Sequence, residues 1–526
     1  MPTIRFGRTI MTSVAALAMT VSMVACGSNQ SASPNTAPTD TTLTLSFLED
    51  PGQPPDPDVF YGTQGLLLTT NTYEGLLGFE SGTAEATLVP ALATSWTASP
   101  DNTVFTFQLR EGVTFHDGTP FLSDAVKASF DRRTAVAQGP AYMVSNVESV
   151  VAEGDHAVTV TLASPDSTFL YQLASPYGPK MLSPTALAAN AGADQAQTYL
   201  MTTDIGTGPY TLTAANVGDR YQLTAYDQYW GKKPYYTQVD IPVISDTSAQ
   251  QLQLDTGEIA AVLHDIPSSA INSYQDNSKF STYVLPTAVS DYMYVNPNTP
   301  VMSNADVRQA LLQAVDLDSL AQNAFFGRGT KAKQVYPANV SDPQYAVQDI
   351  EFDPSRLEAA VAALPADTRS ITIGYDSSSP DNQQVASLLQ TMVAPSGLTA
   401  SVTGYPASQI FGWIDNADQA PDILVNLGFP DAPTPYMFEH INFDPDGGVN
   451  FFKCSSPEAT ELIARGRETG AMEDFSKAAE AALATGCWMN LVDVSDFMVA
   501  QPWLKGVEQA HNIAIPTSLT LNELYQ

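Results

Sequence analysis

The segment TFHDGTPF, residues 114–121, places an imidazole directly beside a carboxylate, at His116 and Asp117. Such a pair can move protons in a hydrolase. The next residue, Gly118, points to a turn, because Gly tolerates positive φ and Asp can bond its own backbone there. We interpret the pair as part of the scaffold, with His116 bracing the turn. An extracytoplasmic hydrolase that uses the two side chains is the alternative.

Other signatures of catalysis are missing from the sequence. It contains no G-x-S-x-G elbow, no H-E-x-x-H motif, no Walker loop and no glycine-rich dinucleotide fingerprint after a strand. The five histidines are scattered along the chain, so no metal-ligand spacing is visible. We therefore expect a protein that is not an enzyme and that needs no cofactor or metal.

The elements around the His-Asp pair follow from periodicity. Residues 102–110 alternate, which predicts a half-buried strand with Phe105, Phe107 and Leu109 on its inner face. After the turn, residues 121–133 have helical spacing, and Ser123 is the predicted N-cap. A strand and a capped helix thus flank the turn.

The same alternation of element types continues towards the C-terminus. Apolar spacing predicts a helix over 304–315, capped by Asn304 or Ser303, and another over 352–364, with Asp353 as N-cap. Short strands are expected at 371–375 and 422–429. Strands interleaved with helices predict a mixed fold, α/β or α+β.

Length and composition limit the possible partners. A chain of 526 residues with 44% hydrophobic residues can form two or three domains. The formal net charge of −34 disfavours binding to nucleic acid or to anionic lipid.

The N-terminus predicts export. Arg5 and Arg8 precede an uncharged run, and Met-Val-Ala-Cys-Gly at 23–27 resembles a bacterial lipobox. We expect residues 1–25 to be a signal peptide, Cys26 to be lipidated, and 26–42 to form a flexible linker. The protein would then lie outside the cytoplasm, at the cell surface or in the periplasm, held to the membrane only by its lipid. An ordinary secretory peptide with an incidental Cys is the alternative.

Two cysteines remain, Cys454 and Cys487. Outside the cytoplasm two cysteines of one region usually pair, so we expect a disulfide. Two unpaired buried thiols are the alternative.

A longer segment carries a family resemblance. The sequence LVPALATSWTASPDNTVFTFQLREGVTFHDGTPFLSDAVKASFDR, residues 88–132, resembles the signature region of the family 5 extracellular solute-binding proteins of bacterial ABC importers. Further segments resemble the family in chain order, at 71–79, 206–212, 226–234, 254–262 and 294–316. The resemblance spans most of residues 43–365 and thins towards the C-terminus.

The resemblance implies a periplasmic-binding-protein-like fold, with two lobes, a hinge and an extra third domain. Domain I would combine residues 43–84, 205–290 and 505–526; domain II would be 85–204 and domain III 291–504. The ligand would occupy the cleft between the lobes, and lobe closure would bury it.

The resemblance also implies the partners. The protein would be a monomer that captures an oligopeptide or dipeptide and delivers it to an ABC permease and ATPase complex. A receptor of the same fold for a nickel chelate, haem or a sugar is the alternative. Sparse histidines argue against direct metal ligation.

Peptide-binding relatives anchor the ligand amine on an Asp that follows a Gly-aromatic pair. The segment LGFPDAPTPY, residues 427–436, offers Asp431 as the ammonium anchor and Phe429 as the adjacent wall. The segment is richer in Pro than the family pattern and has one acid where relatives often have two. A Pro-rich surface loop with a solvated Asp is therefore the alternative. The further ligand-binding candidates, less specific than these two, are Trp413, Tyr73, Glu74 and Asn296, of which Asn296 belongs to a family motif assigned to the hinge.

Overall fold

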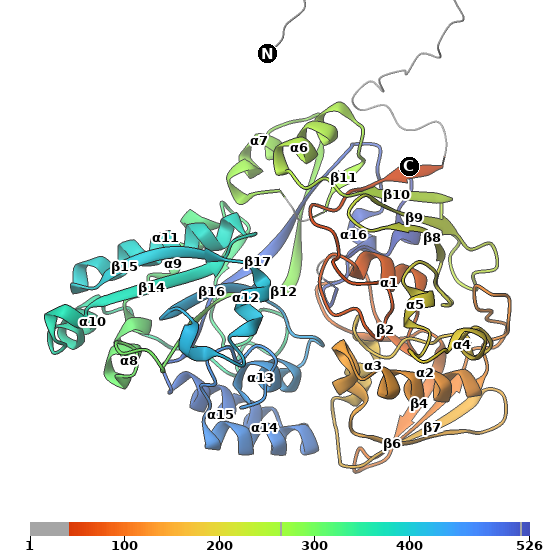
Figure 1. The fold of residues 1–526 in the computed structure, drawn as a ribbon, viewed down its shortest axis with the longest axis horizontal. Helices are drawn as coiled ribbons and strands as arrows, with labels where there is room; N and C mark the ends of the chain where they lie inside the picture. Colours follow the sequence, from red (N-terminus) through yellow and green to blue (C-terminus); the bar gives the residue numbers. More distant parts are fainter. Residues whose placement is uncertain (1–40, 264–265, 516–517) are drawn as a thin grey trace, which may run out of the picture.

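A computed structural model describes residues 41–263, 266–515 and 518–526. The predicted signal peptide 1–25, the lipidation site Cys26 and nearly all of the linker lie outside the described residues. The described residues form four sheets, arranged in two bodies (Figure 1). Within the described part of the chain, no helix has the length and apolar character needed to cross a bilayer.

One four-stranded sheet joins segments from distant parts of the sequence. Its order is β1-β10-β9-β8; β1 is parallel to β10 and the other pairs are antiparallel. C-terminal side chains pack into the same core as this sheet, together with α1; they are Leu504, Val507, Ala510, Leu519, Leu521 and Leu524. The elements are β1 (Thr42–Thr44), α1 (Leu66–Thr72), β8 (Tyr210–Asn216), β9 (Arg220–Ala225), β10 (Gln238–Pro242) and α16 (Val507–Ala510).

A second four-stranded sheet is antiparallel throughout, in the order β4-β5-β7-β6. The predicted strand at 102–110 is confirmed as β5, and Phe105, Phe107 and Leu109 are buried in its core. The elements of this region are β2 (Leu77–Phe79), β3 (Leu88–Pro90), β4 (Ala93–Ala98), β5 (Val104–Leu109), α2 (Ser123–Val136), the 3₁₀ turn η1 (Gly139–Val144), β6 (Val147–Ala152), β7 (Ala157–Leu162), α3 (Phe169–Ala174), α4 (Pro184–Asn190) and α5 (Gln197–Leu200).

The predicted helix after the turn is confirmed as α2, but its predicted cap is wrong. Ser123 is the first helical residue, and the extended residue before it, Leu122, occupies the N-cap position without a side-chain hydrogen bond. The Ser123 hydroxyl donates instead to the backbone oxygen of Gly154. A tertiary partner therefore replaced the local capping bond.

The largest sheet has seven strands, in the order β11-β17-β12-β16-β14-β15 with β13 also paired to β17. Its two long strands, β12 and β17, run antiparallel and pass from one body of the molecule to the other (Figure 1). We call the body with the two four-stranded sheets the N-terminal lobe and the body with β13–β16 the C-terminal lobe. The strands are β11 (Ala261–Val262), β12 (Ser281–Val295), β13 (Gly329–Lys331), β14 (Ser370–Asp376), β15 (Thr399–Tyr405), β16 (Ile423–Gly428) and β17 (Trp488–Ala500).

The pairing of β12 with β17 is interrupted between the lobes. The register runs regularly to Leu285, breaks, and resumes at Val289. Pro286 lies in the break, where its missing N–H cannot contribute a ladder bond. Its carbonyl oxygen accepts a hydrogen bond from Nε2 of His511 at 2.7 Å. The break gives the two long strands a place to bend.

The two helices predicted in the C-terminal lobe are confirmed with their caps. Asn304 accepts a bond from the amide of Asp306 at the start of α8, and Asp353 accepts one from the amide of Ser355 at the start of α10. The helices of this lobe are α8 (Ala305–Gln313), α9 (Leu317–Ala324), α10 (Pro354–Ala362), α11 (Pro380–Val393), α12 (Ala407–Gly412), α13 (Pro435–Phe443), α14 (Pro457–Thr469) and α15 (Met472–Leu483). Two earlier helices, α6 (Thr247–Thr256) and α7 (Ile271–Gln275), pack on β11 and the end of β17 on the side of the N-terminal lobe, where Gln250 of α6 donates to the hydroxyl of Ser46.

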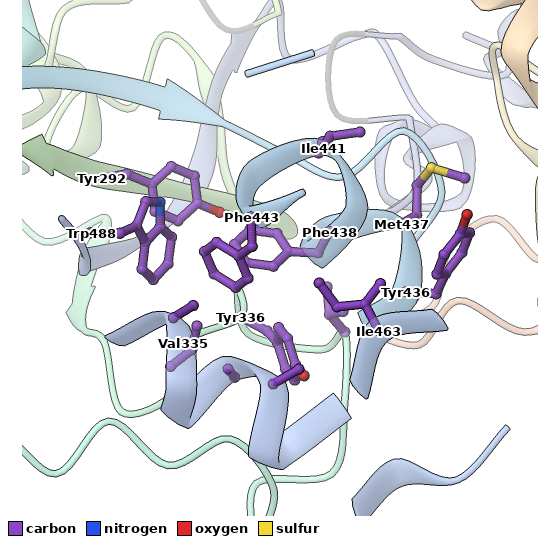
Figure 2. Packing of buried hydrophobic residues seen from close by; sticks show 14 of the residues in the cluster. Tyr292, Val335, Tyr336, Tyr436, Met437, Phe438, Ile441, Phe443, Ile463 and Trp488 are labelled. Carbon is purple, nitrogen blue, oxygen red and sulfur yellow. The ribbon is translucent and has the colours of Figure 1, made fainter. Parts of the chain in front are cut away.

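An aromatic cluster fixes α13 to the two long strands (Figure 2). The ring of Phe438 on α13 lies 5.8 Å from that of Tyr292 on β12 and 5.5 Å from that of Trp488 on β17, measured between centroids. Tyr292 and Trp488 are 5.1 Å apart. Such pairs add to the free energy of burying the rings. Because the segment just before α13 carries Asp431, this cluster also fixes the place of that residue.

Candidate functional site

The His116–Asp117 pair has a structural role. His116 is buried and forms an ion pair through Nδ1 with Asp204, while its Nε2 donates to the backbone oxygen of Gly208 at 3.0 Å. Burial opposes protonation, but the Asp204 carboxylate outweighs it, so the pKa of His116 lies above its ordinary value. Asp117 accepts bonds from the amide and hydroxyl of Thr119. The scaffold interpretation is confirmed.

Asp431 lies between β16 and α13, in the C-terminal lobe. Its side chain is buried, with 7% of the residue exposed. Burial raises the pKa of Asp431 above its ordinary value, and hydrogen bonds from Tyr142 and Tyr61 offset only part of this effect. Among the residues that the structure describes, no Lys or Arg forms an ion pair with it. Asp431 is therefore not a solvated residue of a surface loop, and its role as an ammonium anchor stays a prediction.

Two phenols of the opposite lobe meet at this carboxylate. The hydroxyls of Tyr61 and Tyr142 both donate to Oδ2 of Asp431. The hydroxyl of Ser175, also in the N-terminal lobe, donates to the backbone oxygen of Asp431. Asp431 thus joins the two lobes through its side chain and its main chain. The sequence analysis did not single out Tyr61 or Tyr142, because each stands alone in an irregular segment without periodicity or motif.

Phe429 lies beside this junction. Its ring is nearly parallel to that of Tyr177 in the N-terminal lobe, with an interplanar angle of 15° and 6.5 Å between centroids. Tyr177 in turn contacts Tyr61 edge to face at 5.0 Å. Aromatic faces from both lobes therefore surround the Asp431 carboxylate and exclude water from it.

A cavity of about 300 Å³ begins at Phe429 and lies between the lobes. Its walls include Thr63 from the N-terminal lobe, Gly428 at the end of β16, and residues of β12 and β17 next to the break in their pairing. This volume is at the lower end of small-ligand pockets. A ligand here would contact both lobes and the two strands that join them.

An ion pair closes the far wall of the cavity. Arg328 and Asp381, both on the C-terminal lobe side, pair with one another. Ser268, which precedes α7, donates its hydroxyl to Asp381 at 2.9 Å and accepts from Nε of Arg328 at 2.7 Å. The cavity therefore has a neutralised charged wall at one end and Phe429 at the other, and Asp431 lies two residues beyond Phe429 in the chain, behind the cavity wall.

The lobes also meet below the cavity. Arg467 of α14 pairs with the buried Asp166 at 2.9 Å, and Ser167 donates its amide and hydroxyl to the Arg467 backbone oxygen. With the contacts of Asp431 and Ser268, three groups of hydrogen bonds link the lobes around the cavity. The structure therefore shows the lobes closed on one another.

Trp413 and Asn296 lie within the C-terminal lobe and do not line the cavity. Trp413 is buried between Tyr405 and Phe452. Asn296 is fully buried and donates to the backbone oxygens of Ala417 and Pro421, next to the start of β16. Asn296 thus holds the segment that leads into β16, and Trp413 packs the end of β15 against the segment of Phe452.

Tyr73 and Glu74 are buried inside the N-terminal lobe, away from the cavity walls. Tyr73 packs in a small apolar cluster with Leu182 and Ile205. Glu74 accepts hydrogen bonds from Trp230, Thr207 and Tyr229 at 2.7–3.1 Å. Burial raises the pKa of Glu74, and these donors lower it again in part. In this position the two side chains stabilise the lobe.

Cys454 and Cys487 form a disulfide, as predicted. It joins the segment that precedes α14 to the residue before β17. The disulfide therefore connects the helices of the C-terminal lobe to one of the two strands that cross between the lobes.

Comparisons with curated proteins give relatives along nearly the whole chain. The probable D,D-dipeptide-binding periplasmic protein DdpA of Escherichia coli (strain K12) is 25% identical over 486 residues, which cover 90% of this chain and 93% of that protein. The dipeptide-binding protein of the same organism is 28% identical over 414 residues, covering 73% of this chain and 74% of that protein.

Solved structures show the same fold. NikZ from Campylobacter jejuni, in complex with Ni(L-His), matches with a TM-score of 0.79 at 21% identity, covering 93% of this chain and all of that one. DppA from Helicobacter pylori, in complex with the peptide STSA, matches with a TM-score of 0.79 at 20% identity, covering 92% of this chain and 98% of that one. The predicted periplasmic-binding-protein fold is confirmed.

The family model of the bacterial extracellular solute-binding proteins, family 5 Middle, matches residues 87–449. This range includes the signature segment around His116 and extends beyond Asp431. Members of this family bind solutes and are not enzymes, in agreement with the structural role of the His-Asp pair. The chain therefore belongs to the family 5 extracellular solute-binding proteins.

Proposed function

We propose that this protein is the receptor of an ABC importer for short peptides, and that it holds the N-terminal ammonium group of its ligand on Asp431. The observation that carries the proposal is a buried carboxylate between the lobes, two residues from the cavity wall at Phe429, that pairs with no Lys or Arg of the described chain. A buried ionised acid is costly without a cation. The ligand would supply it.

The contrast with other buried acids supports this role for Asp431. Asp58 pairs with Arg132 and Arg133, and Asp166 pairs with Arg467. Asp431 has only neutral hydroxyl donors, and both act on the same oxygen, Oδ2. A carboxylate can accept about four hydrogen bonds, so an ammonium group can still bind.

Peptides fit the remaining features better than other solutes. An extended main chain offers donors and acceptors to the polar walls, and its side chains can extend along the cavity. Two of the relatives above carry names that specify dipeptides, and one of the solved structures holds a peptide. A cavity of about 300 Å³ favours ligands at the short end of the peptide range.

Delivery completes the proposal. A lipid on Cys26 and a linker to residue 42, after removal of residues 1–25, would keep the monomeric receptor near the permease and its ATPase and raise their effective concentration. The domain division 43–84 with 205–290 and 505–526, 85–204, and 291–504 belongs to the same proposal.

The test is direct identification of the ligand. The full chain is purified in detergent, incubated with a pancreatic digest of casein and separated from unbound material. Native mass spectrometry gives the mass of the complex. The protein is then denatured, and the released species are sequenced. We expect a set of short peptides with free amino termini. The same digest after N-acetylation should give no retained peptide, and Asp431→Ala should retain none from either. Retention of N-acetylated peptides would refute the role of Asp431, and retention of a non-peptide solute alone would refute the peptide assignment.

A further inference from the structure

A single buried guanidinium forms hydrogen bonds with all three segments whose tyrosines surround the site at Asp431 and Phe429. Arg133, on α2, is fully buried. Its five N–H donors all bind acceptors in other segments of the N-terminal lobe, at 2.6–3.5 Å. The acceptors are the carboxylate of Asp58 and the backbone oxygens of Pro57, Pro140, Tyr177 and Gly178.

These acceptors lie in the three segments that carry the tyrosines of the site. Tyr61 follows Asp58 by three residues, Tyr142 follows Pro140 by two, and Tyr177 offers its own carbonyl. Tyr61 and Tyr142 donate to Asp431, and Tyr177 faces Phe429. The guanidinium therefore joins the backbones behind all three rings.

The segments of Tyr61 and Tyr142 also touch one another at Gly139. A Cβ placed there would lie 2.8 Å from the backbone oxygen of Val59 and 3.1 Å from Cβ of Tyr61. Gly139 also has a φ of +44°, which disfavours other residues. The close approach at Gly139 and the hydrogen bonds of Arg133 therefore both hold the segment of Tyr61 against the segment of Tyr142.

We propose that Arg133 is a positioning residue of the binding site, which sets Tyr61, Tyr142 and Tyr177 in the geometry that closes on Asp431. This inference rests on the proposed function only for the identity of the ligand, because the contacts that close the lobes are made by the protein itself. Arg133 acts through the tyrosines and does not touch the cavity.

The neighbouring residue provides a matched control. Arg132 is also buried, at 4% exposed, and pairs with Asp56 and Asp58. Its Nε donates to the backbone oxygen of Gln195. It therefore belongs to the same charge network but binds neither the segment of Tyr142 nor that of Tyr177. Lysine cannot replace the planar fork at either position, because its ammonium has three donors around one nitrogen.

The experiment compares Arg133→Lys with Arg132→Lys in the full chain, each alone and combined with Tyr61→Phe/Tyr142→Phe. Lobe closure is read without ligand by energy transfer between dyes at Val217 and Phe352, exposed positions on opposite lobes, after substitution by Cys. Peptide retention from the casein digest is read in parallel.

We expect Arg133→Lys to lower the closed-to-open ratio about tenfold or more, and Arg132→Lys to change it less than about twofold, at similar losses in thermal stability. In the background without the two hydroxyls, Arg133→Lys should have a clearly smaller effect on closure, because only the contact of Tyr177 with Phe429 is left to lose. A full additional effect in that background, or equal effects of the two Lys variants, would overturn the proposal.

A second variant decides the question if Arg133→Lys does not fold. Gly139→Ala pushes the same segments apart without removing a buried charge, and it should lower closure and retention as Arg133→Lys does. Wild-type closure in Gly139→Ala would overturn the proposal. If the wild-type protein closes but retains no peptide, the proposed function fails, and the closure measurements still decide the role of Arg133.

Discussion

Removal of two oxygen atoms should open the cleft. The hydroxyls of Tyr61 and Tyr142 donate to one oxygen of Asp431 across the lobes. The variant Tyr61→Phe/Tyr142→Phe keeps both rings, and with them the edge-to-face contact at 6.5 Å between their centroids. It removes the two hydrogen bonds to the carboxylate and the weaker contact of the Tyr142 hydroxyl with the sulfur of Met437.

The magnitude follows from the burial of the acceptor. A hydrogen bond to a charged group contributes about 1.5–3 kcal/mol net. The two bonds share Oδ2, so their contributions are not additive, and Tyr142 also contacts the sulfur of Met437 at 3.4 Å. We therefore expect a loss of about 2–4 kcal/mol from the closed state, which changes the closed-to-open ratio by a factor of about 30–1000.

The assay is the distance between dyes on the two lobes, measured without ligand near neutral pH. Tyr336→Phe is the matched control, because the Tyr336 hydroxyl donates to a buried carboxylate, Glu439, at 2.6 Å inside the C-terminal lobe. It should lower thermal stability and leave the lobe distance unchanged. A lobe distance in the double Phe variant equal to that of the wild type would refute the idea that these bonds hold the lobes.

Three further predictions concern pH, buried charge and the disulfide. Peptide affinity should fall as the pH drops, because only the ionised form of Asp431 attracts an ammonium group. Burial raises the pKa of Asp431, so the fall should start above the ordinary Asp pKa of about 3.9. Calorimetry from about pH 8 to pH 4 measures the affinity, and an affinity that does not change over this range would contradict the prediction. Burial raises the pKa of Asp291 well above its ordinary value, so its contribution to stability is complete below the unfolded pKa of about 3.9 and is lost as the pH rises through the folded pKa. Near pH 8 the free energy of unfolding of Asp291→Asn, measured in urea, should therefore exceed that of the wild type by at least ~1 kcal/mol. An equal gain at pH 4 would show that ionisation of the buried acid is not the reason. Replacing both Cys454 and Cys487 by Ala should lower the free energy of unfolding by about 3–4 kcal/mol for a loop of this size and leave peptide affinity intact, whereas a lost affinity would assign the disulfide to the site.

Local signals in the sequence predicted local structure well. Asn304 and Asp353 cap their helices as predicted, because each bond spans only two residues and needs no other part of the chain. The same reasoning failed at Ser123, whose hydroxyl found the backbone oxygen of Gly154 instead. A cap can be predicted from sequence until a tertiary partner competes for the same side chain.

The residues of the candidate site also differ in whether the sequence could indicate them. Asp431 and Phe429 could be proposed because the resemblance to the family places an acid after a Gly-aromatic pair. Tyr61 and Tyr142 could not, since they are 370 and 289 residues away from Asp431 in the sequence. In the sequence Arg133 is only one charged residue of a predicted helix, and the fold alone shows that it binds the segments behind the tyrosines.

The position of Asp431 makes ligand binding and lobe closure depend on one another. A ligand ammonium group favours the ionised carboxylate, and an ionised acceptor strengthens the hydrogen bonds from Tyr61 and Tyr142. By linkage, closure of the lobes must raise the affinity for the cation by the same factor as the bound cation raises the closed-to-open ratio. A solute without a positive charge would lack this coupling, so it could enter the cavity without closing the lobes through this carboxylate. Selection for cationic ends would then come from closure as much as from contact.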